Sequence, residues 1–155
     1  MPTPAIVTGV RALKQWIGKS LGVTEWLTIT QEQIQAFADA TGDRQWIHVD
    51  VERARSESPF RGTIAHGYLT LALAPRLLPQ LVDVQGARLV VNYGIEKLRL
   101  PAPVPAGARI RMGAEVKAVR DIPGGAARVT LGIQFEIEGQ RKSACTADLI
   151  YVYVP

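Results

Sequence analysis

The chain has 155 residues, of which 47% are hydrophobic and 21% charged. This length and composition are typical of one globular domain and argue against disorder. Eighteen lysines and arginines exceed 14 acidic residues, but they are scattered along the chain, which favours a solvated basic surface over nucleic-acid binding. The single cysteine, Cys145, excludes an intrachain disulfide and a multi-cysteine metal site, and it suits a reducing compartment.

The first twenty residues and the apolar runs predict neither a secretory signal nor a membrane span. Arg11, Lys14 and Lys19 interrupt the start of the chain, so no apolar signal core forms there. The longest strongly apolar stretch, residues 67–75, is far shorter than the roughly 20 residues needed to cross a bilayer. We therefore expect a cytoplasmic protein with no membrane partner.

The first third of the chain predicts two helices and a short strand. Residues 9–19 have the pattern of an amphipathic helix, with Val10, Leu13 and Ile17 on one face. Residues 25–30 alternate and are rich in Thr and Trp, which favours a strand. A helix is then expected to begin with a capping box at Thr30 and to end at Gly42.

The middle of the chain predicts an ordered loop followed by a buried helix. Residues 43–62 are rich in polar and turn-forming residues and are expected to hold one helical turn near residues 51–56. Residues 65–78 carry apolar side chains in every direction around a helix, which is typical of a buried helix. Pro75 is expected to kink this helix or to end its first half.

The second half of the chain changes to an alternating pattern rich in β-branched residues. This pattern predicts long strands at residues 88–99, 108–120, 126–138 and 142–154, with hairpin turns at residues 122–125 and 138–140. Helices followed by antiparallel strands indicate an α+β fold. The simplest packing is one buried helix wrapped by a curled antiparallel sheet.

The chain contains two histidines, His48 and His66, which lie close together in the sequence. Asp43 and His48, on one ordered loop, could hold a water molecule and move its protons, because imidazole can accept and donate a proton near neutral pH. The spacing alone leaves other roles open. Asp43 could be a turn or cap residue, and His48 could be packed in the core near Trp46.

A second candidate feature is the start of the buried helix at Gly67. The first amides of a helix have no internal partner and lie at the positive end of its dipole. Because Gly67 has no side chain, a ligand carbonyl could approach its amide closely. The alternative is that Gly67 only permits tight packing, and for His66 a local capping or hydrogen-bonding role is preferred.

These residues resemble a known family. Residues 37–43, His48-Val-Asp50 and residues 60–67, in this order, resemble the MaoC-like dehydratases, which include the (R)-specific enoyl-CoA hydratases. Residues 91–94 and 98–104 are similar to the nodulation-protein-N-like subgroup. The resemblance runs from about Thr24 to the end, so the chain is divided into an N-terminal helical extension, residues 1–20, and a single domain, residues 21–155.

The resemblance implies a hotdog fold, in which a bent antiparallel sheet wraps a long central helix, and a homodimer. The implied reaction is reversible syn addition of water to a trans-2-enoyl thioester, giving an (R)-3-hydroxyacyl thioester, with no metal or redox cofactor. Asp43 and His48 match the catalytic pair of the family, and Gly67 matches the backbone donor to the thioester oxygen. The thioester would be an acyl-CoA or an acyl group on a carrier protein.

One departure from the family is the Asn-Pro pair between the catalytic residues, which is Gln45 and Trp46 here. Gln45 keeps a side chain that can hydrogen-bond, and burial of Trp46 could still rigidify the loop. Gln45 is also expected to bind substrate. The side chains expected to line the substrate tunnel, for which core packing is the alternative, are Trp46, Phe60, Ile64, Tyr68 and Tyr93. The competing functions are an acyl-CoA thioesterase of the same fold and a non-catalytic acyl-CoA-binding subunit.

Overall fold

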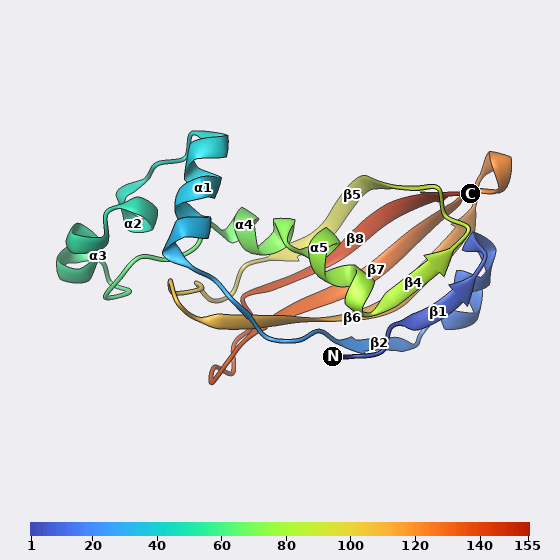
Figure 1. Cartoon of the computed structure of the whole chain (residues 1–155), viewed down its shortest axis with the longest axis horizontal. Helices are drawn as coiled ribbons and strands as arrows, with labels where there is room; N and C mark the ends of the chain where they lie inside the picture. Colours follow the sequence, from blue (N-terminus) through green and yellow to red (C-terminus); the bar gives the residue numbers. More distant parts are fainter.

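A bent antiparallel sheet forms the body of the molecule in the computed structural model, which describes residues 1–155 (Figure 1). The strand order is β2-β6-β7-β8-β5, and the short β3 also pairs with β6. The four long predicted strands are confirmed, and the turn between β6 and β7 places Gly124 and Gly125 at positive φ. The strands of this sheet are β2 (Ser20–Val23), β3 (Leu27–Thr28), β5 (Leu89–Arg99), β6 (Arg109–Asp121), β7 (Ala127–Ile137) and β8 (Cys145–Val154).

The helical segment that lies over the sheet is broken into three pieces: α4 (Gly67–Ala72), α5 (Ala74–Leu77) and the 3₁₀ helix η2 (Leu78–Gln80). The expected interruption near Pro75 is confirmed, because proline lacks the amide that would continue the hydrogen-bond ladder. The expected α+β hotdog architecture, a helix against the inner face of a bent antiparallel sheet, is also confirmed.

Burial on all sides of this helical segment is the part of the prediction that is wrong. Leu69, Leu73 and Leu77 are buried in the core, but Tyr68 is 67% exposed and Ala72 is also exposed. The sheet of a single chain covers only one side of α4 and α5. The other side, together with β5, carries uncovered apolar residues.

The N-terminal segment differs from the expected helical extension. It forms a strand, β1 (Ala5–Thr8), that pairs in parallel with β4 (Val82–Gln85), and then a 3₁₀ helix, η1 (Val10–Trp16). The side chains of Val7, Val10 and Leu13 lie in the main hydrophobic core. Ile17, expected on the same buried face, is 46% exposed, since η1 ends before it and the chain turns into a bridge with Val116.

Three helices form one end of the molecule beyond the sheet (Figure 1): α1 (Gln31–Thr41), α2 (Trp46–Val49) and α3 (Val51–Glu57). The predicted capping box of Thr30 with Gln33 is present, and Gly42 ends α1 in the left-handed conformation. The loop predicted to hold one helical turn contains two short helices, α2 and α3. No helix of the structure has both the length and the apolar character needed to span a membrane.

Candidate active site

The carboxylate of Asp43 is held by the turn that follows α1. Because Gly42 adopts φ 80° and ends the helix, Asp43 is the first residue after the turn. Its amide donates to the hydroxyl of Thr41 over 3.3 Å, and its Oδ1 accepts from the amide of Gln45 over 3.4 Å. The Asp43 side chain is 54% exposed, so the carboxylate is tethered but can meet a ligand from solvent.

The ring of His48 is buried and has a defined proton position. Its Nδ1 lies 2.7 Å from the carbonyl oxygen of Ile64, and the residue is 7% exposed. A carbonyl oxygen can only accept, so Nδ1 must carry a proton. In the neutral ring, Nε2 therefore has a free lone pair, which is the state that can accept a proton from water.

Gln31, at the start of α1, ties the segments of the site together. Its Nε2 donates to the carbonyl of His48 over 2.7 Å, and its Oε1 accepts from the hydroxyl of Thr63. One side chain thus joins α1, α2 and the segment leading into α4. The role of Gln31 could not be predicted from local sequence patterns, because its partners lie 17 and 32 positions away.

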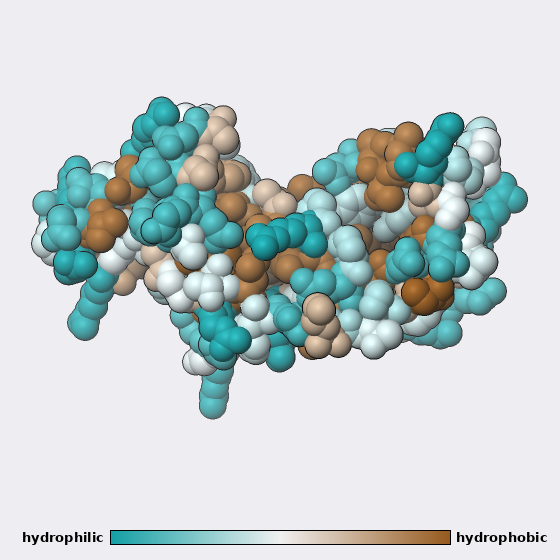
Figure 2. All heavy atoms as spheres, viewed as in Figure 1, coloured by the Kyte–Doolittle hydropathy of each residue, from teal (hydrophilic) through white to brown (hydrophobic).

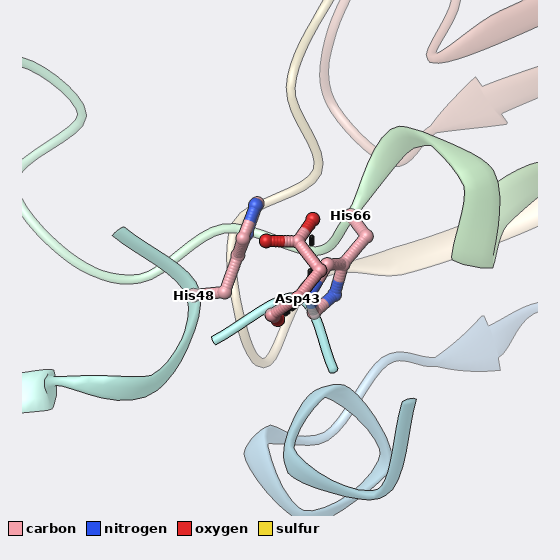
Figure 3. Close-up of side chains that lie close together, drawn as sticks. All are labelled: Asp43, His48 and His66. Carbon is pink, nitrogen blue, oxygen red and sulfur yellow. Dashed lines mark hydrogen bonds and ion pairs between the residues drawn. The ribbon is translucent and has the colours of Figure 1, made fainter. Parts of the chain in front are cut away.

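His66 lies against both members of the Asp43–His48 pair (Figure 3). Its Nε2 is 2.9 Å from the carbonyl oxygen of Asp43 and 3.9 Å from the carboxylate Oδ2. Its ring stacks on that of His48, with 3.9 Å between centroids and 23° between planes. The local role preferred for His66 is therefore wrong, because its partners come from a segment about twenty residues earlier.

A pocket of about 260 Å³ opens at this cluster. It is lined by Phe37, Thr41, Asp43, His48, His66, Gly67, Tyr68 and Leu100. The amide of Gly67 donates to no group of the protein. A Cβ atom at Gly67 would lie 2.5 Å from Cδ1 of Leu100, so the missing side chain lets Leu100 pack closely against the start of α4 at this wall of the pocket.

The spacing of the polar atoms suits a bound water molecule. Asp43, His48 and His66 each offer one oxygen or nitrogen, and these atoms lie within 4.8 Å of one another. One water making two hydrogen bonds of about 2.8 Å holds its partners about 4.5 Å apart. The hydrogen bond to the Asp43 carbonyl leaves Nε2 of His66 protonated, so this nitrogen is not free to bind a metal.

The other predicted substrate-binding residues divide into three groups. Tyr68 and Tyr93 line an apolar groove of about 570 Å³ between α4 and β5, and Tyr68 also borders the small pocket. Ile64 is buried and contributes its carbonyl to His48. The remaining three, like Ile64, line neither space: Gln45 is exposed, Trp46 packs under Arg53 and Phe60 borders a separate hollow.

The groove is electrically neutral along its β8 wall. Tyr151 borders it, and burial raises the pKa of this phenol above its ordinary value. The hydroxyl therefore stays uncharged at physiological pH. An uncharged apolar wall suits a hydrocarbon chain.

Comparison with known proteins gives one consistent result. The chain is 50% identical over 137 residues to 3-hydroxyacyl-thioester dehydratase Z of Mycobacterium tuberculosis, covering 88% of this chain and 90% of that protein. It is 41% identical over 138 residues to nodulation protein N of Rhizobium leguminosarum bv. viciae, covering 88% and 85%. Among solved structures, a monoamine oxidase regulatory protein from Archaeoglobus superposes with a TM-score of 0.80 at 25% identity, covering 97% of each chain.

The family match covers most of the chain and includes the whole site. The model described as "MaoC like domain" matches residues 13–134, which span α1, the Asp43–His48 loop and α4. The expected family and the expected class of enzyme, a dehydratase and hence a lyase, are both confirmed by these relatives. The chain belongs to the MaoC-like dehydratase family.

Proposed function

We propose that the protein adds water reversibly to trans-2-enoyl thioesters and releases (R)-3-hydroxyacyl thioesters. One observation carries this proposal: the Asp43 carboxylate and a His48 ring nitrogen lie within 4.8 Å of each other beside the unpaired Gly67 amide. A thioesterase would not need His48, and a binding subunit would need neither group. The name of the mycobacterial relative, a 3-hydroxyacyl-thioester dehydratase, supports the same chemistry.

The proposed hydration step uses the proton positions of the site. A water held between Asp43 and Nε2 of His48 attacks the β-carbon of the enoyl group while the pair takes up one of its protons. The Cα–Cβ double bond becomes a single bond, and negative charge moves to the thioester oxygen. The Gly67 amide donates to this oxygen. Return of the proton to the α-carbon from the same side completes a syn addition, and dehydration is the reverse.

The substrate proposal follows from the two spaces beside the pair. The acyl chain would lie in the apolar groove that contains Tyr68 and Tyr93, which adjoins the small pocket at Tyr68. The thioester carrier, coenzyme A or a carrier protein, would remain outside. No resident cofactor is required, because a carboxylate, an imidazole and a backbone amide supply every step.

We further propose that the protein works as a cytoplasmic homodimer. β5 pairs with β8 on one side only, so its outer edge has unpaired backbone groups. Hydrophobic residues gather over α4, α5 and β5 (Figure 2), and those on β5 are 43–62% exposed: Leu89, Val90, Val91, Tyr93 and Ile95. An exposed apolar edge strand is normally covered, and a second copy would cover it and close the groove.

The deciding experiment follows the loss of enoyl absorbance when crotonyl-CoA is added to the protein. We expect Asp43→Asn and His48→Gln each to lose at least about a hundredfold in kcat, the range that general acid–base groups supply. Asp39→Asn is the matched control, because Asp39 is an equally exposed carboxylate on α1 that is paired with Arg44 and lies outside the pocket. An (S)-specific hydroxyacyl dehydrogenase should not oxidise the product.

Two results would reject the proposed function. Release of free thiol at the rate of substrate loss would indicate a thioesterase. Binding of crotonyl-CoA without turnover, unaffected by Asp43→Asn, would indicate a non-catalytic subunit. Unchanged hydration in both site variants would overturn the assigned residues while leaving the reaction in place.

A further inference from the structure

The imidazole of His66 has three neighbours in the site and no freedom to turn. It is 3% exposed, and its Nε2 lies 2.9 Å from the Asp43 carbonyl. One face stacks on His48 at 3.9 Å, and Phe37 packs against the ring at 4.9 Å with a tilt of 51°. His66 therefore contacts the backbone of one member of the proposed pair and the ring of the other.

These contacts determine which ring nitrogen of His66 carries a proton. The Asp43 carbonyl can only accept, so Nε2 carries a proton. In the neutral ring, Nδ1 is then an acceptor, and this atom is buried without any hydrogen-bond partner. An unsatisfied buried polar atom costs about 1–3 kcal/mol, and native proteins keep few of them. A residue chosen for packing alone would not retain this atom, since an apolar ring would avoid the cost.

The position of His66 in the chain adds a second constraint. It is the residue directly before Gly67 and the N-cap of α4, so its backbone fixes where the unpaired Gly67 amide points. Its side chain reaches back 23 residues to Asp43. The same residue thus connects the proposed oxyanion donor with the proposed proton-transfer pair.

We propose that His66 is a positioning residue for the Asp43–His48 pair, an inference that rests on the proposed hydratase function. Its Nε2–H fixes the main chain of Asp43, which sets the place of the carboxylate. Its ring face fixes the plane of His48, so that Nε2 of His48 faces the bound water. His66 takes up no proton in the reaction; it acts through the two residues that do.

Three substitutions separate the hydrogen bond from the stack. In His66→Gln, the amide nitrogen can reach the place of Nε2 and donate to Asp43, but the ring is lost. His66→Phe keeps an aromatic ring on His48 and has no donor. His66→Asn is the matched amide control, because its nitrogen reaches only the place of Nδ1.

The measurement is kcat and KM for crotonyl-CoA in each variant. We expect kcat to fall tenfold to a hundredfold in His66→Phe and His66→Asn with KM within about threefold, because misplaced catalytic groups slow the step without removing substrate contacts. His66→Gln should recover kcat to within about tenfold of wild type. Wild-type kcat in His66→Phe, or equal losses in the Gln and Asn variants, would overturn the proposed hydrogen-bond role.

A second measurement does not depend on activity or on the variants folding. The chain contains only two histidines, so long-range ¹H–¹⁵N spectra of the wild-type protein resolve both rings. We expect a protonated Nε2 for His66 and a protonated Nδ1 for His48. An unprotonated Nε2 on His66 would overturn the inference, because that atom could not donate to the Asp43 carbonyl. Absent hydration by wild type would reject the proposed function instead, while the spectra would still report the hydrogen bond.

Discussion

The Nδ1 atom of His48 lies 2.7 Å from the backbone carbonyl oxygen of Ile64. This bond joins α2 to the segment that leads into α4, and it fixes which nitrogen of the ring is protonated. In the proposed mechanism, the His48 side chain therefore has a structural role through Nδ1 and a chemical role through Nε2. The two roles can be separated by substitution.

Asparagine places its amide nitrogen near the position of Nδ1 but has no group at the position of Nε2. We therefore expect His48→Asn to keep the Ile64 bond and to lose hydration by at least about a hundredfold. His48→Leu should lose activity equally and also lose about 1–3 kcal/mol of unfolding free energy, because the Ile64 carbonyl is left unpaired. Urea unfolding compares the two; equal stability would show that this bond does not stabilise the fold.

Gly67 and Leu100 share one wall of the small pocket. An added Cβ at position 67 would come within 2.5 Å of Cδ1 of Leu100, so Gly67→Ala must displace that side chain or the Gly67 backbone. We expect Gly67→Ala to lower kcat for crotonyl-CoA about tenfold or more, as for a displaced oxyanion donor. Adding Leu100→Ala should return kcat to within about threefold of wild type. A double variant as slow as Gly67→Ala alone would show that space at Leu100 is not the cause.

The bridge made by Gln31 should be measurable as a coupling energy. Gln31→Ala leaves the buried Thr63 hydroxyl and the His48 carbonyl without this partner, so we expect a loss of about 1–3 kcal/mol in unfolding free energy. Thr63→Val removes the hydroxyl that donates to Gln31. The loss of unfolding free energy in the double variant should be smaller than the sum of the losses in the two single variants. Gln31→Glu is the control, since it can accept from Thr63 but cannot donate to His48. Additive effects would mean that the residues act independently.

Much of this fold follows from local patterns in the sequence. The alternating β-branched runs predict β6 to β8 because each has a buried and a less buried face, whereas β5 has the same residue types without a buried face. The Thr30–Gln33 box and Gly42 predict the ends of α1 because caps are local. β1 was missed, because four residues that pair with β4 more than seventy positions away carry no distinctive period. The 3₁₀ form of η1 was also missed, since it is set by packing on the core.

Part of the candidate site, like part of the fold, could be predicted from the sequence. That Asp43, His48 and Gly67 lie at one pocket could be predicted from the family resemblance of the blocks that contain them. Gln31 and His66 could not, since their contacts cross 17 to 32 positions and depend on how α1 and α4 meet. Trp46 and Phe60 were predicted to line the tunnel on apolar character alone, which does not specify direction.

The burial of Cys145 in the sheet can be tested by the pH dependence of the protein's stability. It is fully buried on β8, and burial raises the pKa of its thiol from 9.0 to about 11. Between pH 9 and about 11 the thiol therefore stays protonated in the folded state but ionises in the unfolded state. The free energy of unfolding keeps its full value below pH 9 and falls as the pH rises from 9 to about 11. The loss in wild type should exceed that in Cys145→Ala by about 2–3 kcal/mol. Parallel pH dependences of the two proteins would contradict the raised pKa.

The exposed edge strand β5 gives the test of assembly. Val91 is 46% exposed on β5, and Val23 on β2, at the other end of the strand order, is similarly exposed at 43%. If a second copy covers β5, Val91→Lys places a charge in the interface, whereas Val23→Lys only adds one to a solvated edge. We expect sedimentation to give twice the chain mass for wild type and Val23→Lys, and a single chain for Val91→Lys. Hydration should fall with the dimer, because the partner would cover the groove beside Tyr68; a fully active wild-type monomer would contradict this.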